Sequence, residues 1–143
     1  MMGLLGNVAE VQRLRFRLMT TEYITVFGEL LDSQSDGIEV SYNAAGVLAH
    51  ITSDGANAWN ISLPTREDVL NRMILAIERW SLDTERNINY RSFEPILGLI
   101  KCFDTPACQL WAVWALANLT KVSFLNDLFI YFIVLKCFFV NVY

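Results

Sequence analysis

Apolar residues recur along most of this chain at the three- and four-residue spacing of an amphipathic helix. Val69, Met73, Ile77 and Trp80 illustrate it, because they fall on one helical face, where packing against other helices is their expected role. No stretch shows the two-residue alternation of a half-buried strand. The pattern predicts an all-α protein with helices at residues 3–17, 20–32, 38–53, 65–81, 92–103 and 105–121.

Turn-forming residues separate these helices. Residues 33–37 and 53–57 combine glycine with residues that hydrogen-bond their own backbone. Residues 64–68, Pro-Thr-Arg-Glu-Asp, predict a helix that begins with a capping residue and acid in its first turn. We interpret residues 87–90 as a linker and residues 104–106 as a break before the last helix. Short connections of this kind join antiparallel helices in a solenoid.

One short sequence frame occurs three times. In Ala112–Leu119 a tryptophan precedes an asparagine by four positions, so both lie on one face of a helix. Ala44–Ile51 can be laid over this segment, and Gly3–Val8 over the end of that second copy. The copies are 43 and 68 residues apart. The first interval matches an armadillo or HEAT unit of roughly 40 to 47 residues, and the second matches one unit plus an insertion of about 25.

The three copies predict an armadillo/HEAT-like helical solenoid fragment. Their alignment puts Asn7, His50 and Asn118 at equivalent positions, which we expect to line one concave groove together with Trp114. Because Trp111 and Trp114 are three positions apart, we expect one of them in the core and the other toward the groove.

Composition narrows the function classes. A net charge of -4 with 18% charged residues provides no basic stripe for nucleic acid, and 54% hydrophobic residues argue against disorder. We therefore expect a protein or peptide partner. The chain has one histidine and no phosphate loop, nucleophile motif or metal-ligand cluster. These features argue against an enzyme, a metal site and a bound cofactor.

The cysteines indicate the cellular compartment of the protein, and the N-terminal residues indicate where the chain starts relative to the repeats. Three cysteines, an odd number, occur without a recognisable secretory leader. We expect reduced thiols in the cytoplasm or nucleus, with Cys102 and Cys108 in the core. The first copy of the frame follows Met1 closely and has no N-cap before it. This position predicts that the chain begins inside a repeat of a longer solenoid.

The composition changes after Lys121. Residues 122–143 contain five of the nine phenylalanines, and their longest apolar run, Leu128–Leu135, has eight residues before Lys136. A spanning helix needs about 20 apolar residues, so a membrane anchor is the least favoured interpretation. A final helix packed on the solenoid end and a non-native tail from altered splicing or read-through are the alternatives. We therefore expect partial repeats at 1–121 and a tail outside the repeats at 122–143.

Several longer strings carry a family resemblance. They are Gly6–Val11, Leu14–Met19, Leu30–Tyr42, Ala44–Gly46, Glu85–Leu97, Asp104–Pro106, Gln109–Trp111 and Trp114–Thr120. With them, the chain from about Leu4 to Lys121 closely resembles the C-terminal armadillo-like region of the Zyg-eleven and Zer-one family. The resemblance implies a substrate receptor of cullin-RING ubiquitin ligases. Its armadillo-like repeats would bind substrates that begin with glycine and so direct them to ubiquitination and degradation.

The resemblance also implies site residues. In the family, an Asn-x-x-Glu motif lines the pocket for the terminal glycine, and here the motif is Asn7 to Glu10. Glu10 would bind the amine, which is largely charged near neutral pH, and Asn7 would bind the peptide backbone. A solvated polar helix face is the plainer interpretation of the same two residues.

The chain departs from the family in two respects. The preceding repeat, which supplies Trp-Asn-x-x-Asp to the other side of the pocket, has no counterpart here, and neither have the leucine-rich repeats and the elongin- and cullin-binding segment. We therefore expect weak binding of N-terminal glycine and no recruitment of elongin or cullin by this chain alone. A generic armadillo-type peptide-binding scaffold without a ligase role is the alternative function.

Overall fold

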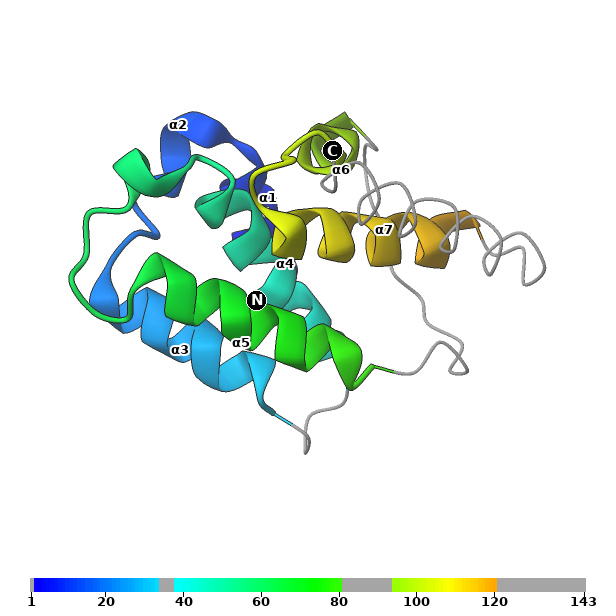
Figure 1. The fold of residues 1–143 in the computed structure, drawn as a ribbon, viewed down its shortest axis with the longest axis horizontal. Helices are drawn as coiled ribbons and strands as arrows, with labels where there is room; N and C mark the ends of the chain where they lie inside the picture. The colour runs from blue at the N-terminus through cyan, green and yellow to red at the C-terminus, as the bar shows by residue number, and fades with distance from the viewer. Residues whose placement is uncertain (1, 34–37, 81–93, 121–143) are drawn as a thin grey trace, which may run out of the picture.

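The computed structural model describes residues 2–33, 38–80 and 94–120. These ranges contain helices and no strand (Figure 1), which confirms the predicted all-α solenoid class. The helices are α1 (Met2–Glu10), α2 (Gln12–Arg15), α3 (Thr21–Leu31), α4 (Ile38–Thr52), a short 3-10 helix (Ala56–Ala58), α5 (Arg66–Glu78), α6 (Glu94–Ile100) and α7 (Pro106–Thr120).

The first predicted helix, residues 3–17, is wrong as a single element. The other five match described helices within three residues at each end, and the predicted ends at 81, 92 and 121 lie outside the described residues. It divides at Val11, whose backbone is extended at φ -87° and ψ 102°. Arg15 of α2 folds back and donates its Nε to the Ala9 carbonyl at 2.6 Å and its Nη2 to the Glu10 carbonyl at 3.4 Å. Because carbonyls at a helix end need such partners, the Arg15 side chain stabilises the end of α1.

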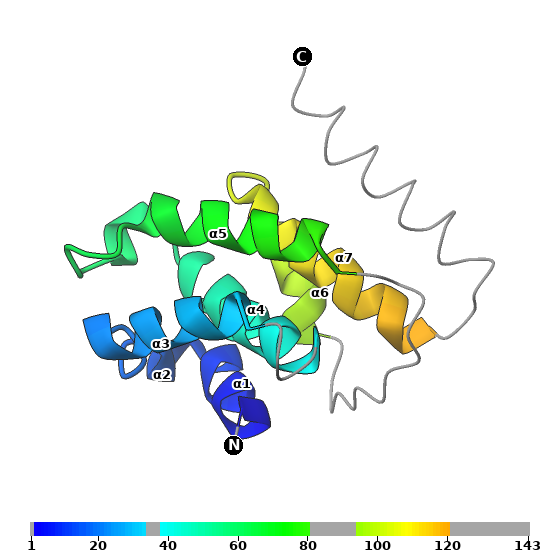
Figure 2. The same ribbon diagram turned by 90° about the horizontal axis from the view of Figure 1, so that it is seen from below.

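Helix α4 lies at the centre of the fold, with α5 on one side and α1 on the other (Figure 2). It contacts α1, α2, α3, α5 and α7. Small buried residues make this close packing possible: Ala44, Ala45, Gly46 and Ala49. A Cβ atom at Gly46 would lie 2.5 Å from the ring of Trp111, so only glycine admits α7 at this distance.

Aromatic side chains join α4, α7 and the segment that follows α5. The rings of Tyr42 and Trp111 have centroids 5.6 Å apart, and Trp80 packs edge-on against Trp114 at 5.5 Å. Trp111 also donates its Nε1 to the Tyr42 carbonyl at 3.0 Å. Both tryptophans of α7 are buried, and the groove-lining role of Trp114 stays a prediction.

Hydrogen bonds fix the start of α5. The capping box predicted at residues 64–68 is confirmed, since Thr65 Oγ1 accepts from the Asp68 N–H and the Asp68 carboxylate accepts from the Thr65 N–H, both at 3.1 Å. Arg66 donates its Nη2 to the Thr52 carbonyl at 2.8 Å and to Thr105 Oγ1 at 3.0 Å. The start of α5 is thereby tied to the end of α4 and the start of α7.

The turn predicted at residues 53–57 is confirmed. Gly55 has a φ of 90°, in the left-handed region that favours glycine, and the 3-10 helix follows directly. The tail at 122–143, the linker at 87–90 and all but the first residue of the turn at 33–37 lie outside the described residues. None of the described helices is long and apolar enough to cross a membrane.

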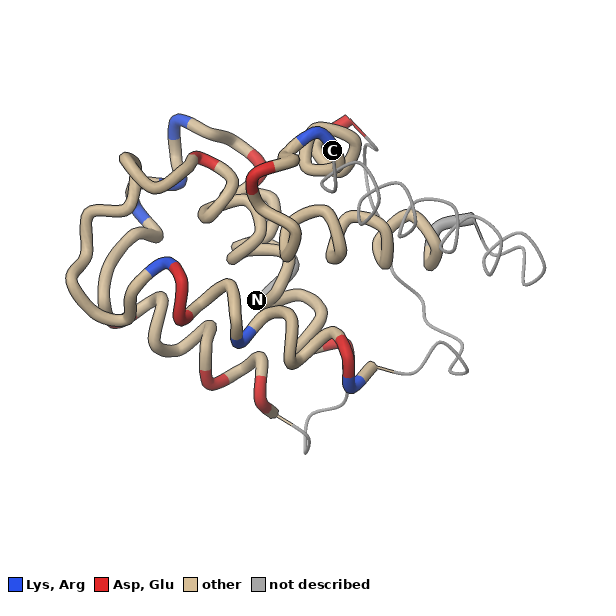
Figure 3. The backbone as a smooth tube through the Cα atoms, viewed as in Figure 1, with Lys and Arg blue, Asp and Glu red and all other residues tan. Residues whose placement is uncertain are grey.

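Charge is unevenly distributed over the helices (Figure 3). Helix α3 carries acidic residues only and α2 basic residues only, whereas α7 carries no charged residue. A helix that is apolar on every side is expected to be buried, and the α7 side chains from Ala107 to Ala117 are buried except for half-buried Leu110.

Candidate functional site

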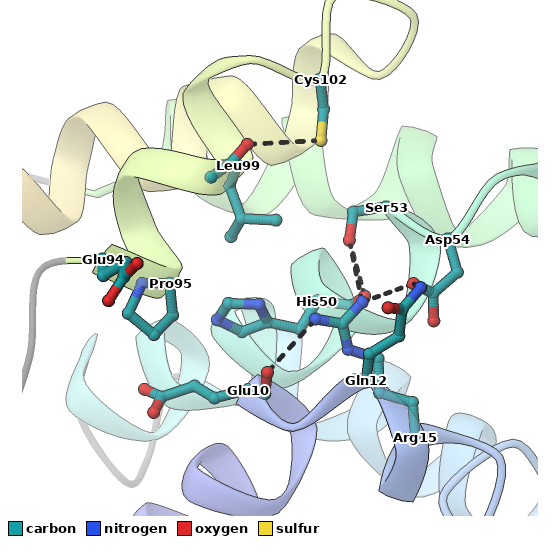
Figure 4. A pocket seen from close by; sticks show the side chains of 11 residues that line it. Glu10, Gln12, Arg15, His50, Ser53, Asp54, Glu94, Pro95, Leu99 and Cys102 are labelled. Carbon is teal, nitrogen blue, oxygen red and sulfur yellow. Dashed lines mark hydrogen bonds and ion pairs between the residues drawn. The ribbon is translucent and has the colours of Figure 1, made fainter.

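A cavity of about 420 Å³ lies where the ends of α1 and α4 approach α6. Its walls come from the last residue of α1, from α2, from the end of α4 and the turn that follows, and from α6 with its own following turn (Figure 4). The charged residues of the lining are Glu10, Arg15, Asp54 and Glu94. Three carboxylates against one guanidinium make the cavity acidic.

Arg15 and Asp54 form an ion pair at one side of the cavity. Arg15 Nη1 lies 2.5 Å from Asp54 Oδ1, and these side chains are only 12% and 15% exposed. Gln12 Nε2 donates to the same oxygen at 3.3 Å. The guanidinium of Arg15 is therefore neutralised by Asp54, and the carboxylate of Glu10 adds negative charge to the lining.

Glu10 is the last residue of α1, and its side chain is half-buried. Burial raises the pKa of its carboxyl group above the usual value, because desolvation disfavours the charged form. Its carboxylate makes no hydrogen bond or ion pair with any other described residue. A half-buried carboxylate in this state favours a cation that enters the cavity, since that cation would restore the interactions lost with water.

His50 lies deeper, in the last turn of α4, and is only 3% exposed. Its ring packs edge-on against Trp111, with centroids 5.9 Å apart and an interplanar angle of 66°. Burial, and secondarily the positive charge of Arg15, lowers the pKa of His50 to about 4. The imidazole is therefore neutral near pH 7.

The structure brings two of the sequence-predicted site residues together. Glu10 and His50 both line the cavity, while Asn7 is exposed on α1 and lies outside the lining. Asn118 is also outside it and donates its Nδ2 to the carbonyl of Trp114, in its own helix, at 2.9 Å. The roles assigned to Asn7, Glu10, His50, Trp114 and Asn118 in ligand binding stay predictions.

Sequence reasoning missed the residues that complete the cavity. Arg15 and Asp54 are 39 positions apart, and Glu94 is a further 40 positions along the chain. Spacing within one helix therefore could not have grouped them. Cys102 was expected in the core, but it is only half-buried and lies in the cavity lining.

The thiols of the described residues are in their weakly reactive form. Cys108 is buried as predicted, and burial raises the pKa of its thiol to about 12. Burial, followed by the nearby Asp104 carboxylate, also raises the pKa of Cys102. Neither group supplies a thiolate near neutral pH. In the part of the chain that the structure describes, no cluster of three or more potential metal ligands occurs.

Comparison with known proteins places the chain among relatives. Residues 1–132 match the family model described as the C-terminal domain of protein zer-1 homolog-like proteins. A protein zer-1 homolog from Drosophila melanogaster is 59% identical over 150 aligned residues, covering 85% of this chain and 19% of that protein. The human protein zer-1 homolog is 58% identical, with 85% of this chain and 16% of that protein covered.

A more distant relative agrees. Zyg eleven-related protein 1 from Caenorhabditis elegans is 53% identical over 86% of this chain and 14% of its own length. The chain thus spans less than a fifth of each of these relatives. The family match runs past Lys121, and the boundary expected there stays a prediction. The match over most of the chain and these identities show that the chain belongs to the Zyg-eleven and Zer-one family and corresponds to the C-terminal domain of zer-1 homologs.

Proposed function

We propose that this chain is a substrate-binding part of a cullin-RING E3 ubiquitin ligase receptor, and that it reads proteins with an N-terminal glycine. The family resemblance supplies the ligase context. The chain matches the C-terminal domain of its relatives and less than a fifth of their length, and the family resemblance assigns the elongin and cullin contacts to other parts of those relatives. Its own contribution is the recognition of the substrate in the cytoplasm or nucleus.

The position of Glu10 supports this proposal most directly. Its carboxylate lines the cavity and forms no ion pair with any described residue, since the guanidinium of Arg15 is paired with Asp54 instead. A terminal ammonium group has the charge opposite to that of Glu10, and it offers three N–H donors. Asn7 lies three positions earlier, so it is a neighbour of Glu10 on the surface of α1 and can bind the polar backbone that follows the amine.

Binding fits the described residues better than catalysis does. His50 has a pKa of about 4 and Cys108 a pKa of about 12, so neither is poised for proton transfer or nucleophilic attack near pH 7. We therefore propose that the chain is not itself an enzyme and that it needs no cofactor.

Calorimetric titration tests the proposal with two peptides of one sequence, one with a free N-terminal glycine and the other with that amine acetylated. The free peptide should bind more tightly, because acetylation removes the charge that Glu10 attracts. Glu10→Gln should weaken binding of the free peptide by roughly 1.5 to 3 kcal/mol, the usual value of a hydrogen bond to a charged group. The same titrations with a full-length relative, in which the family resemblance places a second carboxylate beside the amine, should give higher affinity.

Glu29→Gln is the matched control. Glu29 is exposed on α3 and lies outside the cavity lining, so its substitution removes the same charge without touching the site. The control should bind as the unchanged protein does. Equal affinity for both peptides in every variant would instead favour the generic armadillo scaffold, which binds extended peptides without reading their ends.

A further inference from the structure

The imidazole of His50 is a buried polar group that the fold leaves without a hydrogen bond among the described residues. It is 3% exposed, and its ring contact with Trp111 is an aromatic one. In Figure 4 the ring points toward the side of the cavity where Glu10, Glu94 and Pro95 lie. Buried polar side chains in native proteins nearly always hydrogen-bond protein or water, so an imidazole that faces a cavity can bond a group that enters the cavity.

The equivalent repeat position shows a different solution. In the repeat alignment, Asn118 of α7 is equivalent to His50. Its Nδ2 donates a hydrogen bond to the carbonyl of Trp114, one turn earlier in the same helix, at 2.9 Å. Packing within its own helix thus accounts for Asn118. The ring nitrogens of His50 form no such hydrogen bond within their own helix. The ring faces the cavity instead of a carbonyl of α4.

The charges around His50 decide which groups of a ligand it can meet. Glu10 faces the cavity from α1, Arg15 from α2, Asp54 from the turn after α4 and Glu94 from α6. Asp54 is paired with Arg15, so it is the carboxylate of Glu10 that attracts the cationic end of a ligand. A neutral imidazole offers one donor and one acceptor, which match the carbonyl oxygen and the N–H of a peptide group.

We propose that His50 is a specificity-determining residue that hydrogen-bonds the first peptide group of the ligand, next to the terminal amine held by Glu10. The proposal rests on the proposed function and extends it. The ligand must then be an amine followed directly by an amide, as in a peptide chain, and a simple amine of similar size lacks the group that His50 binds. His50 contributes selectivity for a peptide end, while Glu10 contributes selectivity for its charge.

Nuclear magnetic resonance tests this proposal directly, because His50 is the only histidine of the chain. Its ring signals therefore need no assignment by mutation. The free glycine-initiated peptide, titrated into the unchanged chain, should shift the ring nitrogen signals, and the shift should saturate with the dissociation constant that calorimetry measures. Ethylamine at the same concentrations should leave the ring nitrogens nearly unmoved.

Two variants supply the matched comparison. His50→Asn keeps a donor and an acceptor and should bind the peptide within about three-fold of the unchanged chain. His50→Phe keeps a ring but loses both polar atoms, and it should bind about ten-fold more weakly, the loss of one to two hydrogen bonds. Circular dichroism checks that each variant is folded. If the phenylalanine variant does not fold, the ring signals of the unchanged chain and the asparagine variant decide the question.

The outcomes separate this proposal from the function on which it rests. Peptide binding that depends on the free amine, with ring signals unmoved or with the phenylalanine variant binding normally, overturns the role of His50 alone. Equal binding of free and acetylated peptides overturns the reading of the terminal amine and the role of His50 with it. A saturating ring shift together with amine dependence supports both.

Discussion

At the scale of single residues, two glycines show that the stability lost on substitution by alanine depends on which atoms the added methyl group contacts. A Cβ at Gly46 would lie 2.5 Å from the Trp111 ring, and a Cβ at Gly28 would lie 2.6 Å from the guanidinium of Arg72. Trp111 is buried and held by its bond to the Tyr42 carbonyl. The guanidinium of Arg72, in contrast, is the end of a long and flexible side chain that is partly exposed to solvent. Similar distances therefore predict unequal costs.

Gly46→Ala should lower the free energy of unfolding by about 1 to 3 kcal/mol, because the buried indole cannot move aside without disturbing the core. Gly28→Ala should change it by about 1 kcal/mol or less, since Arg72 can shift toward solvent and alanine favours the helix. Urea denaturation of both variants measures the difference. A smaller loss for Gly46→Ala than for Gly28→Ala would contradict the rigid α4–α7 contact.

His50 predicts a dependence of stability on pH. Its pKa is about 4 in the folded chain and near 6.5 when exposed, so the unfolded chain binds more protons between these values. The stability associated with neutral His50 is therefore complete above pH 6.5 and falls as the pH drops toward 4, by about 3 kcal/mol in all. The lowered pKa of Asp32 acts below this window, and the raised pKa of Glu10 acts in the opposite direction.

Urea denaturation between pH 7 and pH 4.5 tests this prediction in the unchanged chain and in His50→Asn. Asparagine does not titrate, so the variant should lose less stability over this range. Parallel curves for the two proteins would contradict the lowered pKa, because they would mean that His50 has the same pKa in the folded and the unfolded chain.

At the scale of helices, the capping box of α5 predicts a local effect. Thr65→Ala removes the side-chain acceptor of the Asp68 N–H, so it should lower the free energy of unfolding by about 1 kcal/mol. Thr25→Ala is the matched control, because Thr25 is exposed within α3 rather than at a cap. Thermal or urea denaturation should show a loss for the first variant and none for the second. Equal behaviour would mean that tertiary contacts, and not the cap, determine where α5 begins.

At the scale of the whole molecule, the central position of α4 predicts that its backbone hydrogen bonds are the last to open. Helix α4 packs against five other helices, whereas the main packing of α6 is against α7. Amide hydrogen exchange should therefore be slowest in α4, through global unfolding, and faster in α6, through a smaller opening. Because α6 supplies Glu94 and Pro95 to the cavity, the glycine-initiated peptide should slow exchange in α6. Slower exchange in α6 than in α4 before peptide is added would contradict this order.

The sequence by itself determined five of the six predicted helices, the turn at 53–57, the cap at Thr65 and the family. These features depend on contacts within about four residues of the chain, or on long strings of residues in order, and both are visible without a structure. It also pointed to Glu10 and His50, because the repeat alignment and the family motif single out their positions.

Only the tertiary structure decided that the first helix divides at Val11 and that Glu10, His50 and Glu94 share one cavity. Helical periodicity runs through Val11 without a break, and the Arg15 side chain that stabilises the end of α1 is itself held by Asp54, 39 residues away. The burial of His50 likewise depends on Trp111, from a helix much later in the chain. Contacts of this kind are set by how helices pack, and local sequence spacing carries no record of them.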